Sequence, residues 1–93
     1  MATDQARTSI ESDRLELAAE MAAEMGDAWQ KQFGPGSFGC HELLDRVSLV
    51  SKLLDEAVVS HPACVQKPEW YELARRACDA LNDLYQQVGA EHV

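Results

Sequence analysis

Residues 40–68 read CHELLDRVSLVSKLLDEAVVSHPACVQKP, and they predict one helix of a hairpin together with its connection. Apolar residues recur here in steps of four and three, the spacing of one helical face. They are Leu43, Val47, Val50, Leu54 and Ala57, with Leu44, Leu53 and Val58 widening the stripe. The pattern ends before Pro62, because proline disfavours a helical conformation in the residue before it. We predict a helix over about 40–59.

A further helix is predicted over about 68–88. Pro68 suits the first helical position, and Gly89 is a natural stop. The apolar stripe between them consists of Trp70, Leu73 or Ala74, Ala77, Leu81, Leu84 and Val88. Only six or seven residues connect the two helices, and a connection this short favours an antiparallel pair.

The part of the chain before this hairpin predicts one more helix and a linker. Thr8-Ser9-Ile10-Glu11 has the spacing of a capping box. The apolar stripe that follows is Leu17, Ala18, Met21, Ala22, Met25 and Trp29. We predict a helix over about 9–31, weakened near Gly26, and a flexible N-terminus over 1–8. Three glycines and a proline make residues 34–39 a linker within a single helical domain over 9–93.

The expected fold is all-α, a small antiparallel bundle of these three main helices. Valine and isoleucine never alternate over the length of a strand. A two-helix hairpin buries one stripe and leaves its flanks in water, so another helix must cover it. We expect the first helix to do so within the chain, and homodimerisation in addition is left open by the wide stripe on residues 40–59.

Composition excludes several classes of function. The chain has 93 residues, with 16 Asp and Glu against 8 Lys and Arg, for a net charge of −8. Such a chain repels phosphate backbones and anionic membrane surfaces. It has no apolar run of the ~20 residues that a membrane span needs. Its first residues lack the basic and apolar regions of a secretion signal, so we expect a cytoplasmic protein that contacts neither nucleic acid nor membrane.

Histidine and cysteine supply the only candidates for reactive chemistry. Cys40, His41, His61 and Cys64 are zinc-compatible ligands, but a helix over 40–59 holds its two ends ~30 Å apart. His61 and Cys64 are three residues apart and within reach of each other, while no oxyanion hole or orienting partner accompanies them. We therefore expect no metal, no cofactor and no catalysis.

His41-Glu42-Leu43 is similar to the start of the motif of histidine phosphotransfer domains, which are small acidic helical bundles. The similarity ends after three residues, because Leu44 and Asp45 stand where a basic residue and a glycine are usual. It implies a phosphoacceptor role for His41. The alternative hypothesis is thus a ligand-binding or phosphotransfer protein that uses His41, or His61 with Cys64.

Acidic and aromatic side chains suggest an interaction surface instead. Residues 1–30 hold seven acids and two bases, so most of the charge lies on the first helix. The surface would consist of Trp29, Phe38, Glu16, Glu20, Glu24 and Asp27. Trp29 and Phe38 flank the linker. They either pack in the core or are presented to a partner. The expected function is a small acidic, non-catalytic interaction or regulatory module, whose partner is a basic protein or a second copy.

Overall fold

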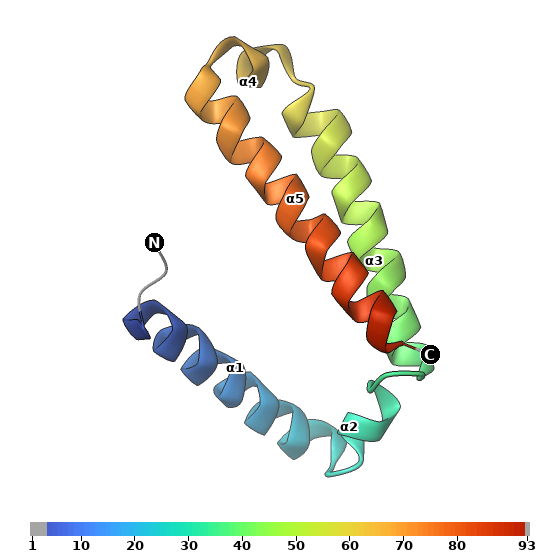
Figure 1. The fold of residues 1–93 in the computed structure, drawn as a ribbon. Helices are drawn as coiled ribbons and strands as arrows, with labels where there is room; N and C mark the ends of the chain where they lie inside the picture. Colours follow the sequence, from blue (N-terminus) through green and yellow to red (C-terminus); the bar gives the residue numbers. More distant parts are fainter. Residues whose placement is uncertain (1–3, 93) are drawn as a thin grey trace. The chain divides into compact units, whose positions relative to one another are not determined.

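The computed structural model describes residues 4–92, and the side chains of residues 8–92. Its elements are α1 (Asp4–Met25), α2 (Trp29–Gln32), α3 (Phe38–Leu54), a π-helical segment η1 (Asp55–Val59), α4 (Pro62–Gln66) and α5 (Pro68–Glu91) (Figure 1). The described residues contain no strand, so the all-α prediction is confirmed.

Two compact units make up the chain, one ending at Gln32 and the other beginning at Phe33. We predicted a single helical domain over 9–93. The division falls beside the predicted linker over residues 34–39. The three-helix bundle remains a prediction.

The first unit contains α1 and α2. The helix predicted over about 9–31 begins earlier than expected, and it breaks at Gly26, where weakening was predicted. The helix α1 starts at Asp4, so residues 4–8 are helical where we expected a flexible terminus, and residues 1–3 lie outside the described residues. It stops at Met25, because Gly26 has a φ of +84°, a left-handed conformation that favours glycine. The short α2 then begins at Trp29.

The predicted capping box is wrong because the helix begins upstream of it. Glu11 lies inside α1, and its carboxylate accepts hydrogen bonds from the Arg14 guanidinium, one from Nε at 2.9 Å. These hydrogen bonds lower the pKa of Glu11 and raise the pKa of Arg14. Both side chains are exposed to solvent, so the pair adds little stability.

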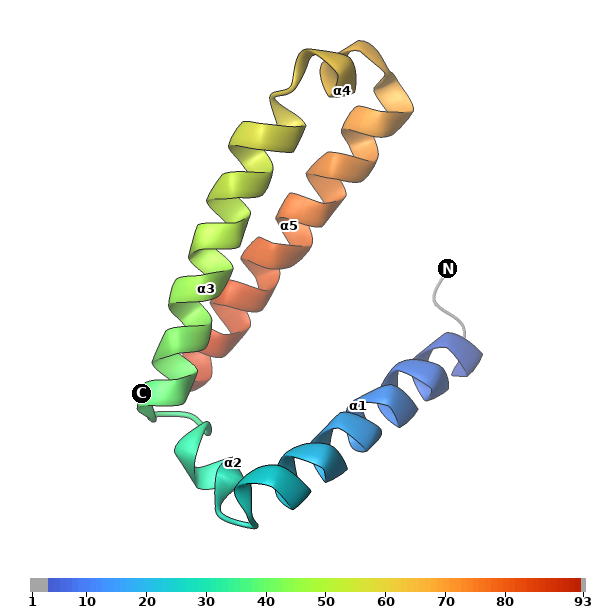
Figure 2. The same cartoon turned by 180° about the vertical axis from the view of Figure 1, so that it is seen from behind.

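The second unit is an antiparallel hairpin of α3 and α5, joined by η1 and α4 at one end; Figure 2 shows the same pairing from behind. The two predicted helices are confirmed, since α3 and η1 run without interruption from Phe38 to Val59 and α5 begins at Pro68. The predicted stop at Gly89 is wrong. Its φ is not positive, and α5 continues to Glu91, where the amide of the C-cap residue His92 donates to the Val88 carbonyl at 2.9 Å.

The start of α3 differs from the predicted linker for a local reason. Ser37 is the N-cap, with extended backbone, and its hydroxyl accepts a hydrogen bond from the Cys40 amide at 3.1 Å. Phe38 and Gly39 therefore belong to the helix, and the linker ends at Ser37. A serine just before an apolar helical run is a typical N-terminal signal, which we overlooked beside the glycines.

Substitution Ser37→Ala is expected to lower the free energy of unfolding by about 1 kcal/mol, because the Cys40 amide loses its acceptor at the end of the helix. Urea unfolding monitored by circular dichroism measures the change. Ser48→Ala, at an exposed position on the same helix, is the matched control and should leave the midpoint unchanged. Equal midpoints for the two variants would contradict the role of the cap.

The core of the hairpin is a narrow seam between α3 and α5. Its side chains are buried or half-buried and recur in steps of four and three, as in a coiled coil, except for one step of seven between Leu81 and Val88. They are Cys40, Leu44, Val47, Ser51 and Leu54 on α3, and Tyr71, Ala74, Cys78, Leu81 and Val88 on α5. Each predicted stripe was thus only partly right: Val47, Leu54 and Ala74 lie in the seam, whereas Leu43, Val50 and Leu73 are exposed.

Candidate functional site

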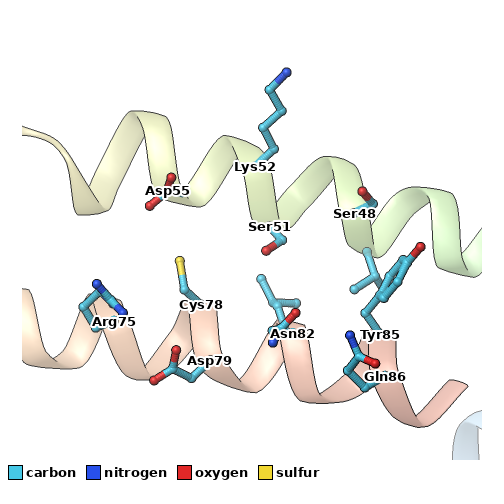
Figure 3. Close-up of a pocket in the computed structure, with 12 residues that line it drawn as sticks. Ser48, Ser51, Lys52, Asp55, Arg75, Cys78, Asp79, Asn82, Tyr85 and Gln86 are labelled. Carbon is cyan, nitrogen blue, oxygen red and sulfur yellow. The ribbon is translucent and has the colours of Figure 1, made fainter. Parts of the chain in front are cut away.

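One flank of the hairpin is a polar groove between α3 and α5 (Figure 3). Serine, amide and charged side chains line most of it, and cations alternate with carboxylates. These are Ser48, Ser51, Lys52 and Asp55 on α3, and Arg75, Asp79, Asn82 and Gln86 on α5. The two cations and two carboxylates balance, so the groove concentrates no charge that would select an anion or a cation.

A hydrogen bond defines the position of the Arg75 guanidinium in this groove. Its Nη1 donates to the Tyr71 hydroxyl at 3.4 Å, one turn earlier on α5. That hydrogen bond, together with the nearby Asp79 carboxylate, raises the pKa of Arg75. The Arg75 guanidinium therefore stays charged and exposed to solvent beside the seam. We assign it a structural role.

The opposite flank is apolar. Leu43, Val50 and Ala57 are seven residues apart on α3 and η1, and Trp70, Ala77 and Leu84 are seven apart on α5, so each set lies on one line along its helix. A shallow depression brings the two lines together, since Ala57, Trp70, Leu73 and Ala77 all line it. We call this surface the apolar face; its members are Leu43, Val50, Leu53, Ala57, Trp70, Leu73, Ala77 and Leu84.

These side chains are open to solvent despite their size. Leu53 is 61% exposed and Leu73 is 63% exposed, and Trp70 is more than half exposed. The sequence indicated a stripe on α3 too wide for one seam, which was the signal for such a face. It did not indicate which residues of the stripe would remain uncovered.

The structure separates His41 from His61 and Cys64, whereas the latter two border the same depression at one end of the hairpin. His41 lies in the first turn of α3, with its Nε2 3.6 Å from an Asp45 carboxylate oxygen. His61 caps α4 at the other end of the hairpin, where its Nδ1 accepts from the Ala63 amide at 3.0 Å. Cys64 is half-buried and borders the depression. Within the described residues, no three His, Cys, Asp or Glu side chains are grouped as metal ligands.

Sequence reasoning missed His92, which joins the open end of the hairpin to the linker. Its Nδ1 accepts a hydrogen bond from the Gly36 amide at 2.9 Å, and its ring lies 5.9 Å from the His41 ring. Gly36 adopts a φ of +84°, which glycine tolerates. A histidine beyond the predicted end of α5 carried no pattern that pointed to this contact.

The predicted interaction surface is distributed over both units. Phe38 is 81% exposed in the first turn of α3, so its interpretation as an anchor on the core is wrong. Trp29 is half-buried and belongs to the first unit. The predicted acids Glu16, Glu20, Glu24 and Asp27 are exposed on and just after α1.

None of the helices in the described part of the chain has the length and apolar character needed to cross a bilayer. Comparisons of the chain with protein-family models, with curated proteins and with solved structures found no match. The surface chemistry of the hairpin is therefore the basis for assigning a function.

Proposed function

We propose that the chain is a non-catalytic protein-interaction module that binds its partner through the apolar face of the hairpin. The exposed line of apolar side chains on both α3 and α5 carries this proposal. Contiguous apolar patches of this kind are uncommon on isolated soluble domains and mark interaction surfaces.

Energetics support the same proposal. Among the described side chains, only those of Cys40, Val47, Val59 and Ala74 are buried, and none of them is large. Small domains with so little core commonly need a second chain or another constraint for stability. Each leucine or tryptophan that becomes covered adds about 1.5–3 kcal/mol, so a helical partner on this face would stabilise the hairpin substantially.

Two kinds of helix are suited to the apolar face. The first helix of the same chain would give the three-helix bundle expected from the sequence, and a helix of another chain would give an intermolecular bundle. In either arrangement the exposed acids of α1 favour a basic surface on any further partner.

Substitution Leu53→Asp is expected to abolish partner binding, because it places a carboxylate on the apolar face, about one turn from both Val50 and Ala57. Light scattering over a concentration series, combined with a pull-down, measures association. Ser48→Asp introduces the same charge in the polar groove of the same helix and serves as the control. The proposal would be contradicted if the protein is strictly monomeric and if no partner binds Ser48→Asp while failing to bind Leu53→Asp.

A further inference from the structure

We infer that the partner on the apolar face is a second copy of this chain, paired so that α3 of one copy lies against α5 of the other. The twofold axis then runs along the hairpin, and the product is an antiparallel four-helix bundle. This inference rests on the proposed function and specifies its partner.

The register of the hairpin follows from contacts along its length. At the open end, His41 lies beside His92. Farther along, Figure 3 shows Ser48 across from Tyr85, and Asp55 across from Arg75 and Cys78. The pairs His41–His92, Ser48–Tyr85 and Asp55–Cys78 fit one constant antiparallel register, with Arg75 about one turn away from it, and this register sets Leu53 level with Ala80.

Charge complementarity selects the arrangement of the two copies. Arg46 lies seven residues before Leu53 and so borders the apolar face on α3, while Glu91 lies seven residues after Leu84 and extends the apolar line of α5 toward the open end. Arg46 reaches back to Glu42 at 3.5 Å, and the register sets Glu42 level with Glu91. With α3 against α5, the guanidinium of each copy meets Glu91 of the other. An axis across the hairpin would place α3 on α3 and would not pair these charges.

Side-chain sizes fit the same arrangement. Leu53 of one copy opposes Ala80 of the other at the same level, so a large side chain meets a small one twice in each dimer. Large-against-small layers of this kind fill the interior of a bundle without overlap.

The area is adequate for a stable dimer. The line from Trp70 to Glu91 covers 21 steps along α5, or ~31 Å, and two helices side by side are ~20 Å wide. The footprint is therefore ~600 Å² per copy, comparable with the ~800 Å² of accessible surface that each partner buries in a standard interface.

Complementation between chains tests the arrangement on the full-length protein. Sedimentation velocity over a concentration series should show a wild-type dimer, which Leu53→Asp abolishes and Ser48→Asp retains. Arg46→Glu and Glu91→Arg should each raise the dimer dissociation constant about tenfold, because each places like charges together in both symmetry-related contacts at the open end of the hairpin. An equimolar mixture of these two variants should restore wild-type affinity through a heterodimer, which no change within one chain can mimic.

Each other outcome is decisive. A wild-type dimer whose charge variants keep full affinity, or fail to complement each other, overturns the pairing of α3 with α5. If the wild type is monomeric and binds a different partner, and only Leu53→Asp abolishes that binding, the inference of a second copy is overturned. The proposed function then still stands. A monomeric wild type without such a partner contradicts both. Circular dichroism of every variant confirms that helix content is retained.

Discussion

Substitution Val47→Asp is expected to unfold the hairpin of α3 and α5. Val47 is 6% exposed and lies at the centre of the seam. The variant loses the burial of the valine and places a carboxylate there, and none of the ion pairs found among the described residues offers it a cation. We expect a loss of at least ~3 kcal/mol, which is most of the stability of so small a core.

The matched control is Leu49→Asp, two residues along the same helix. Leu49 is 68% exposed, so the same change in charge there costs little, within about 0.5 kcal/mol. Far-UV circular dichroism and urea unfolding of the two variants decide the matter. Equal losses of helix content would show that the seam is not where the hairpin gains its stability.

The second large effect is a gain in stability on substitution of Ser51. Ser51 occupies a seam position between Val47 and Leu54 but offers only a hydroxyl group to the opposing helix. Ser51→Leu would continue the row of apolar side chains in the seam and cover the neighbouring side of Leu81. We expect the free energy of unfolding to rise by about 1–2 kcal/mol, as for other cavity-filling changes. The melting temperature should rise by roughly 5–10 °C.

Ser48→Leu is the control for this gain, because position 48 is exposed whereas position 51 is half-buried, so a leucine at position 48 gains less burial. Thermal unfolding should show no comparable increase for it. A lower melting temperature for Ser51→Leu would mean that the helices are already too close for a larger side chain, and that the serine maintains their spacing.

Much of the hairpin could be predicted because its signals are local. Steps of three and four residues predicted both helices, and Pro62 and Pro68 marked their connection. The exact ends were less predictable, since a glycine that ends a helix and one that continues it look alike. Gly26 adopts a positive φ and ends α1, while Gly89 remains helical within α5. Only the backbone conformation distinguishes the two.

The candidate surface could be predicted only in part. The acids and aromatics near the linker were visible, and so was an α3 stripe wider than one seam requires. Leu43 and Leu44 are equally apolar neighbours, yet Leu44 enters the seam and Leu43 stays on the apolar face. Their difference depends on the rotation of α3 about its axis, which is set by the side chains that α5 presents.

By itself the sequence determined the helical class, the hairpin and the net charge, because periodicity, proline and ionisable groups act within a few residues of where they stand. The tertiary structure alone decided which apolar line became the core and which became a surface, and it alone brought His92 to Gly36. Those outcomes depend on how two helices that are far apart in the chain pack together. Helical periodicity permits several rotations of a helix about its axis that would bury a similar amount of apolar surface.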